Sequence, residues 1–339
     1  MHDKGDWVES RSATANLSNL SNLKVKGMIL SYPSLRRHEG KFEHFSGITV
    51  AEFDALYQRF EPAWTQAEQE RLQQRERQRA IGGGGDYHLA LDTRLLMCLV
   101  WMRHYLTTEA VGYLFGVSQS TASRNLTRLL PVLEALAQET FHWPTPKRGR
   151  RSLRELQHAE SDLLAILDAT EQSVNKPHLD AQARLHFSGK QRRYTCKSAL
   201  RVNEEGMIRQ VTPTSPGSIH DVTHVRQAGL LAHLPPDAIA VADAAFVGIY
   251  QDLPNHGVLV PYKAYRNHPL VPEQRYANRF VARLRIKVEN VFAALKRFRI
   301  LTHRFRHAVA RVHSQVFTII AGLHNQRTFN RLMQATKSA

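Results

Sequence analysis

Three acidic residues, Asp168, Asp243 and Glu289, have the side-chain type and the setting that phosphate chemistry needs. Asp168 and Asp243 each follow a short apolar run, LLAIL and AIAVA, with the composition of a buried β-strand. If these strands are adjacent and parallel, both carboxylates lie at the same edge of the sheet. Carboxylate oxygens favour Mg²⁺ or Mn²⁺, and two such ions about 3.5–4 Å apart can flank a phosphodiester.

Glu289 lies in a segment, residues 275–301, whose spacing predicts a helix with one buried face. The apolar residues at helical spacing are Phe280, Leu284, Val288, Val291, Phe292 and Leu295. Arg285 and Lys296 fall on the same flank as Glu289. From Pro261 onward the chain has 16 Lys and Arg against two acids, so this carboxylate either balances charge or holds a cation beside phosphate. The second interpretation requires partner carboxylates elsewhere in the chain.

The composition favours a polyanionic partner. The chain has 339 residues, a formal net charge of +16 and a sequence pI of about 10.1. This balance indicates nucleic acid rather than an acidic membrane surface, because no basic amphipathic helix is bordered by Trp or Phe. No apolar run reaches membrane-spanning length and the N-terminus lacks a signal-peptide core, so we expect a soluble, cytoplasmic, nucleoid-associated protein. The distant Cys98 and Cys196 argue against a disulfide or zinc framework.

Residues 107–130 have the pattern of a helix-turn-helix inside a predicted helical domain over 28–140. A capped helix from Thr108 to Phe115 and a turn at 116–118 precede a longer helix that starts near Gln119. The second helix offers side chains that can contact bases and phosphates: Gln119, Ser120, Ser123, Arg124, Thr127 and Arg128. A plain helical bundle with a tight glycine turn is the alternative, and the chain's charge favours the DNA-binding interpretation.

The remaining segments complete the predicted organisation. Residues 1–27 form a poorly ordered extension, 141–160 a basic linker, and 161–335 an α/β domain. In that domain, RRYTCKSALRV and GMIRQVTPT alternate and predict an antiparallel hairpin across NEEG. LLAILD, AIAVAD and GVLVPY add short buried strands, the first two ending at Asp168 and Asp243. This succession predicts a mixed sheet with helices against it.

The order of Asp168, Asp243 and Glu289, with the motifs around them, resembles that of the DDE transposases of bacterial insertion sequences, in the branch similar to PIF/Harbinger elements. The resemblance covers roughly residues 28–330, and its motifs are PGSIHD (216–221), LHFSGKQRRYTCK (185–197), RLRIKVENVFAALKRFRIL (283–301) and AGLHN (321–325). It implies an RNase H-like five-stranded mixed sheet with flanking helices after an all-α helix-turn-helix domain. It also implies that Asp168, Asp243 and Glu289 hold two Mg²⁺ or Mn²⁺ ions, while Arg285 and Lys296 contact phosphate.

The resemblance implies a protein that binds terminal inverted repeats in double-stranded DNA, cleaves them and joins the 3′-OH ends to target DNA as a homodimer or larger assembly. The chain departs from the pattern in two places. Ala169 follows the first aspartate where Gly is usual, and Ala245 precedes the aromatic residue after the second. A weakened transposase acting as a DNA-binding protein and a structure-selective nuclease of the same fold are the alternatives. Asp221 we interpret as a helix cap near the site.

Overall fold

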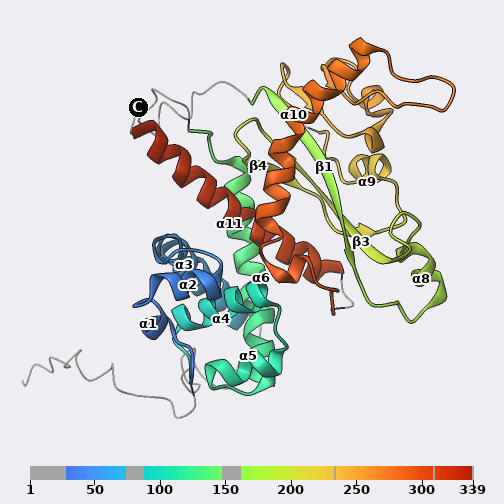
Figure 1. The fold of residues 1–339 in the computed structure, drawn as a ribbon. Coiled ribbons are helices and arrows are strands. Elements are labelled where there is room, and N and C mark those ends of the chain that lie inside the picture. Colours follow the sequence, from blue (N-terminus) through green and yellow to red (C-terminus); the bar gives the residue numbers. More distant parts are fainter. Residues whose placement is uncertain (1–27, 74–87, 147–161, 233, 308–309, 338–339) are drawn as a thin grey trace, which may run out of the picture.

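The computed structural model describes residues 28–73, 88–146, 162–232, 234–307 and 310–337. A helical region comes first, and a mixed sheet with helices against it follows (Figure 1). The predicted extension, residues 1–27, and most of the predicted linker, residues 147–160, lie outside the described residues. None of the described helices has both the length and the apolar character that crossing a membrane requires.

The helical region begins with short helices and is built on two longer ones. Its elements are α1 (Tyr32–Leu35), α2 (Glu39–Ser46), α3 (Val50–Gln73), α4 (Leu91–His104), α5 (Thr108–Phe115), α6 (Gln119–Glu139) and η2 (Thr140–His142). α3 starts at a capping box in which the Thr49 backbone N–H donates to Glu52 at 2.8 Å and the Glu52 N–H donates to Thr49 at 3.2 Å. α4 is buried on all sides from Leu95 to Met102, which places it at the centre of this region.

The turn between α5 and α6 has the geometry that its residues predict. The side chains of Thr107 and Ser118 each accept a hydrogen bond from a first-turn backbone N–H, at 3.2 Å in both cases. Gly116 ends α5 in the left-handed region, at φ 66°. A β-carbon at Gly112 would lie 2.6 Å from the Val117 carbonyl oxygen, so the turn passes too close to α5 for a larger residue at this position. Both predicted helices are therefore confirmed.

The sheet is mixed, and its strands follow the order β2-β3-β1-β6-β7, with β4 and β5 also paired to β3. The strands are β1 (Leu164–Ser173), β2 (Phe187–Ser188), β3 (Arg193–Val202), β4 (Ile208–Val211), β5 (Ser215–Pro216), β6 (Ile239–Val241) and β7 (Val258–Leu259). β1 is antiparallel to β3 and parallel to β6. Within the described residues, the five predicted strands correspond to β4, β3, β1, β6 and β7, and the short strands β2 and β5 are additions to them. The predicted RNase H-like mixed sheet is confirmed.

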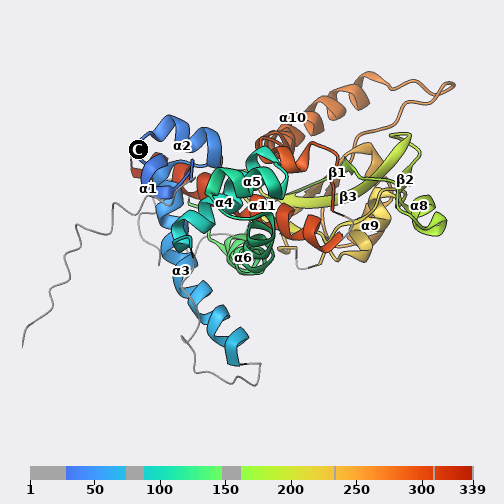
Figure 2. The ribbon, with the colours of Figure 1, turned by 90° about the horizontal axis from the view of Figure 1, so that it is seen from below.

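Helices cover the sheet and connect it to the helical region. They are α8 (Asp180–His186), α9 (Asp221–Gln227), α10 (Pro272–Leu295) and α11 (Ala310–Lys337), with 3₁₀ turns η3 (Ala244–Phe246), η4 (Ile249–Asp252) and η5 (Arg299–Leu301). α10 crosses β1, and α11 packs against both α6 and β4 (Figures 1 and 2). α11 is therefore the element that holds the helical region against the sheet.

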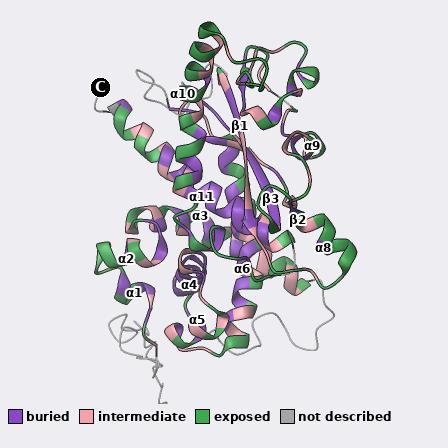
Figure 3. Cartoon of the chain, turned by 45° about the vertical axis from the view of Figure 1, so that its right-hand side comes forward, coloured by how far each residue is buried: buried purple, intermediate pink, exposed green. Residues whose placement is uncertain are grey.

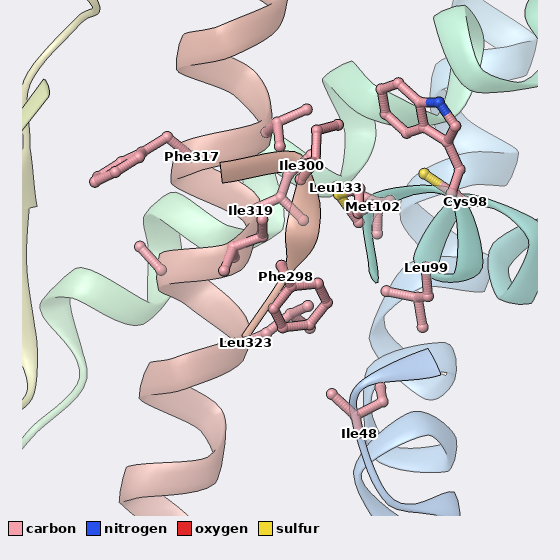
Figure 4. Close-up of a cluster of buried hydrophobic side chains, with 14 of the residues drawn as sticks. Ile48, Cys98, Leu99, Met102, Leu133, Phe298, Ile300, Phe317, Ile319 and Leu323 are labelled. Carbon is pink, nitrogen blue, oxygen red and sulfur yellow. The ribbon is translucent and has the colours of Figure 1, made fainter. Parts of the chain in front are cut away.

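One hydrophobic cluster joins the two regions (Figure 4). It brings Leu99 and Met102 of α4 together with Phe298, Ile319 and Leu323 from the C-terminal part of the chain. Burying one such side chain stabilises a fold by roughly 1.5–3 kcal/mol relative to leaving it exposed. The shared core therefore fixes the helix-turn-helix relative to the sheet.

Two predicted boundaries were wrong. β1 does not end at Asp168 but continues to Ser173, because β3 pairs with it along this whole length, whereas its pairing with β6 stops at Ile166. The helix predicted over 275–301 ends at Leu295, and η5 follows. Phe280 was predicted on the buried face but is 52% exposed, because the N-terminal half of α10 extends beyond the sheet (Figure 3).

A buried histidine in α11, His313, makes the stability of the fold depend on pH. His313 lies between Thr214 and Gln172, at 2.8 and 2.7 Å from its two ring nitrogens, and burial lowers its pKa from 6.5 to about 4. Between these values the unfolded chain binds a proton that the folded protein does not, so stability falls as pH drops from about 6.5 towards 4. We expect His313→Gln to make the fall in thermal midpoint over this interval shallower. Exposed His142→Gln is the control, and an unchanged pH dependence in His313→Gln would contradict the assignment.

Candidate active site and DNA-binding surface

The register between β1 and β6 brings Asp168 and Asp243 to the same edge of the sheet. Ile166 pairs with Val241 in the parallel ladder, and each aspartate lies two residues further along its own segment. Asp168 continues β1, whereas Asp243 caps η3 by accepting a hydrogen bond from the Ala245 backbone N–H. Because the offsets are equal, the two carboxylates are placed side by side.

α10 contributes the third carboxylate. It packs against β1, with Val288 and Phe292 buried and Glu289 on the adjacent, exposed side. A single nitrogen of Arg285, Nη2, lies 3.5 Å from the Asp168 carboxylate, 4.0 Å from that of Asp243 and 3.8 Å from that of Glu289. Three residues separated by 75 and 46 positions along the chain therefore surround one guanidinium group.

The surroundings of Asp168 perturb its carboxyl group. Burial raises the pKa of its carboxyl group to about 6, with smaller upward contributions from Asp243 and Asp221. The Ala169 N–H, which donates to Asp168 at 2.8 Å, and the Arg285 guanidinium both act in the opposite direction. A buried carboxylate close to other acids needs a nearby cation to remain charged.

The donor set fits a divalent cation, but Arg285 holds the space between the donors. Within the described residues, no group of three or more His, Cys, Asp or Glu is close enough to hold a metal in its present arrangement. The three carboxylates lie 3.5–4.0 Å from Arg285 Nη2, whereas the oxygen ligands of Mg²⁺ lie about 2.1 Å from the ion. A cation in the place of this nitrogen would therefore require the carboxylates to move closer. Arg285 Nε is buried without a hydrogen-bond partner, so the guanidinium is incompletely satisfied in this position.

We therefore expect Arg285 to compete with a divalent cation for the three carboxylates. Arg285→Met should destabilise the protein in chelator by about 1–3 kcal/mol, because partly buried carboxylates lose their counter-charge. The rise in thermal midpoint on adding Mn²⁺ should then be larger in the variant than in the wild type. Exposed Arg283→Met is the control, and equal Mn²⁺ shifts in Arg285→Met and wild type would contradict the competition.

A second charged cluster lies three residues further along β1 than Asp168 and was not predicted. The Lys197 side chain is 5% exposed and lies 2.6 Å from Asp221 and 3.7 Å from Glu171, and it donates to the Ile219 carbonyl at 2.5 Å. Asp221 was interpreted as a cap, but it is the first residue of α9 and pairs with Lys197. Lys197 and Glu171 face each other in the β1–β3 register, a relation that the sequence does not disclose.

The two departures from the transposase pattern cause no backbone strain. Ala169 lies within β1 opposite Ala199, and Ala245 lies in η3. Among the described non-glycine residues, only Tyr105 and Arg192 have positive φ. Neither alanine therefore occupies a conformation that requires glycine.

The predicted DNA-reading face of α6 is accessible. Gln119, Ser120, Arg124 and Thr127 are exposed, and Ser123 and Arg128 are partly exposed. Arg124 donates to the Ser120 carbonyl at 3.2 Å, and Gln119 donates to Thr108 of α5 at 3.0 Å, so these side chains are held on the helix surface. Lys296 lies apart from the carboxylates, at the C-terminus of α10, with its ammonium 5.7 Å from the Phe292 ring centre. Its role in phosphate contact stays a prediction.

Comparison with known families agrees with both regions. Residues 167–325 match the model of the DDE superfamily endonuclease, and residues 87–139 match that of the helix-turn-helix of the DDE superfamily endonuclease. Asp168, Asp243 and Glu289 fall within the first range, and the candidate DNA-contacting residues of α6 fall within the second. Both regions of the chain therefore resemble the DDE superfamily of endonucleases.

Its sequence is similar to those of insertion-sequence transposases. It is 27% identical over 238 residues to a probable transposase for insertion sequence element IS702 of Microchaete diplosiphon, covering 70% of this chain and 80% of that protein. It is 23% identical over 255 residues to a putative transposase for IS112 of Streptomyces albus G, covering 72% and 87%. No solved structure gives a significant match. The PIF/Harbinger branch is not distinguished and stays a prediction.

Proposed function

We propose that the protein is a DNA transposase that binds the terminal inverted repeats of its element, cleaves them and joins the 3′-OH ends to target DNA. The observation that carries the proposal is the convergence of Asp168, Asp243 and Glu289 on one Arg285 nitrogen. We assign metal binding to the three carboxylates. Similarity to two insertion-sequence transposases supports the same class of reaction.

DNA binding is assigned to two surfaces. The exposed polar face of α6 would contact the inverted repeats, with Gln119 and Arg124 among the candidate base contacts. The strongly basic C-terminal part of the chain would bind phosphates near the carboxylates. Because one hydrophobic core joins α4, α6 and α11, the bound repeat would be held at a fixed position relative to the sheet.

Both proposed steps are in-line displacements at phosphorus. In the first, water attacks a phosphodiester, the bond from phosphorus to the 3′-oxygen breaks, and a 3′-hydroxyl is released. In the second, that hydroxyl attacks a target phosphodiester and displaces another 3′-oxygen. Asp168, Asp243 and Glu289 would hold Mg²⁺ or Mn²⁺, two ions in all. Such ions supply charge stabilisation to the reacting phosphate and lower the pKa of bound water.

Arg285 has a separate role in the proposal. In the protein without metal it neutralises the three carboxylates, and with its side chain turned outwards it would bind a phosphate of the DNA. Pairing of two element ends requires at least two protomers, so we propose a homodimer or larger assembly on DNA.

One incubation separates this proposal from its alternatives. The protein is mixed with Mn²⁺, a target plasmid and labelled DNA carrying the inverted repeats that flank its gene. A transposase yields both cut ends and label joined to the plasmid. A DNA-binding protein derived from a transposase binds the label without cutting it, and a structure-selective nuclease cuts without joining. Either of the last two results would overturn the proposal.

A further inference from the structure

A tyrosine-rich pocket lies beyond the carboxylates, at the end of the molecule where α10 begins. The pocket has a volume of about 660 Å³ and is lined by residues after Asp243, by the loop before α10 and by the start of that helix. Tyr250, Tyr262 and Tyr265 line it, and they are 57%, 54% and 66% exposed. We call this group of three side chains and the space between them the tyrosine pocket.

The loop that carries two of these tyrosines is held in place. The Asn278 side chain of α10 forms two hydrogen bonds with the backbone of Tyr262, accepting from its N–H at 2.8 Å and donating to its carbonyl at 3.0 Å. Tyr265 and His268 form a reciprocal backbone pair at 3.2 and 3.1 Å. These bonds order the loop although its aromatic rings lie in solvent. A loop whose backbone is already ordered loses less entropy when a ligand binds to its side chains.

The surroundings of the tyrosine pocket are strongly basic. Between positions 261 and 287 the chain has seven Lys and Arg and one acid, Glu273. Lys263, Arg266, Arg275 and Arg279 are exposed, and no ion pair is formed by any of these four within the described residues. A ligand that is both aromatic and negatively charged matches this combination of stacking surfaces and unpaired cations.

We propose that the tyrosine pocket binds an unstacked nucleobase of DNA, with the neighbouring Lys and Arg contacting the phosphates on either side. The proposal rests on the proposed transposase function and adds a ligand site to it. A base within an intact duplex is already stacked on both faces, so the ligand must be in an unpaired or displaced strand. Such bases stack on aromatic side chains with little regard to sequence.

The position of the tyrosine pocket limits where the unpaired base lies. Asn278, which holds the loop, and Glu289 are eleven residues apart on α10, which corresponds to about 16 Å along the helix axis. Successive nucleotides of one strand are about 3.4 Å apart along a stacked duplex and further apart in an extended single strand. The unstacked base is therefore expected within about five nucleotides of the phosphate that reacts.

The test compares DNA with and without bases in a single-stranded tail. The full chain, in EDTA to prevent cleavage, is titrated with an end duplex bearing a five-nucleotide tail and with the same duplex whose tail is abasic. Wild-type protein should bind the tail with bases about 5- to 100-fold more tightly. Tyr262→Ala or Tyr265→Ala should remove most of this preference, and Tyr262→Trp should retain it. Tyr276→Ala is the matched control, because Tyr276 is 74% exposed on α10 but does not line the pocket.

Three results of this titration would contradict base binding in the tyrosine pocket. Equal weakening on both tails, no effect in either tyrosine variant, or loss of preference in Tyr276→Ala would overturn the proposal. The proposal would also be overturned if Tyr262→Ala or Tyr265→Ala changed the sedimentation coefficient of the protein but left its tail preference unchanged. That result would assign the surface to contact between copies of the chain. Repeating the titration with a duplex of scrambled sequence distinguishes element ends from target DNA as the source of the base. Cleavage is scored separately, so a wild-type protein that cuts without a tail preference refutes only this inference.

Discussion

Asp168→Asn is expected to lower the rate of strand cleavage in Mn²⁺ at least about a thousandfold. The amide preserves the shape of the side chain but removes the negative charge, and with it a metal-dependent stabilisation of roughly 4 kcal/mol. Asp243→Asn and Glu289→Gln should behave in the same way. The measurement is release of a labelled strand from inverted-repeat DNA at saturating protein.

Binding of the same DNA should change little in Asp168→Asn, because the helix-turn-helix lies on α5 and α6, away from the carboxylates. A gel-shift titration at fixed salt measures this affinity. Asp180→Asn, at an exposed position in α8, is the control for removing one aspartate from the same region. Cleavage by Asp168→Asn at the wild-type rate would remove this residue from the site, whatever the affinity for DNA.

Asn325→Leu is expected to lower the free energy of unfolding by roughly 3–5 kcal/mol, since it leaves buried backbone groups unpaired. Asn325 is fully buried in α11, and its side chain both accepts from the Ile208 N–H and donates to the Ile208 carbonyl, each at 2.7 Å. It also donates to the Thr140 carbonyl at 3.2 Å. One amide therefore connects α11, the strand β4 and the end of α6.

Thermal unfolding measures the effect of Asn325→Leu, and a loss of this size in a chain of 339 residues corresponds to a fall of about 4–7 °C in midpoint. Asn330→Leu is the matched control, because Asn330 is exposed on the same helix. Leucine has the same branching and number of side-chain heavy atoms as asparagine, but its methyl groups are larger than the amide oxygen and nitrogen, so overpacking adds to the loss of the polar bonds. A midpoint within about 1 °C of that of Asn330→Leu would show that the Ile208 bonds contribute little to stability.

The role of Asn325 illustrates the limit of a motif. The motif AGLHN was part of the resemblance to transposases, but the motif alone does not indicate whether Asn325 binds a ligand or stabilises the fold. The structure assigns it to the edge of the sheet, opposite Ile208. Lys197 is a similar case, since its partners Glu171 and Asp221 come from other elements.

Sequence by itself determined the elements that depend on nearby residues. Both bounds of α5 and the start of α6 follow from Thr107, Gly116 and Ser118, because caps and turns are made within a few residues. The β3–β4 hairpin and the apolar runs of β1 and β6 follow from side-chain periodicity. The acidic types at 168, 243 and 289, and the excess of basic residues after Pro261, are likewise properties of the chain alone.

Only the tertiary structure decided how these elements meet. The pairing of Ile166 with Val241 brings two aspartates to one edge, and a shift of one residue would point one of them to the opposite face. The position of Arg285 among three carboxylates depends on how α10 crosses β1, and β1 runs past Asp168 because β3 pairs with it there. Register and helix packing are set by contacts between residues remote in sequence, and local pattern carries no information about them.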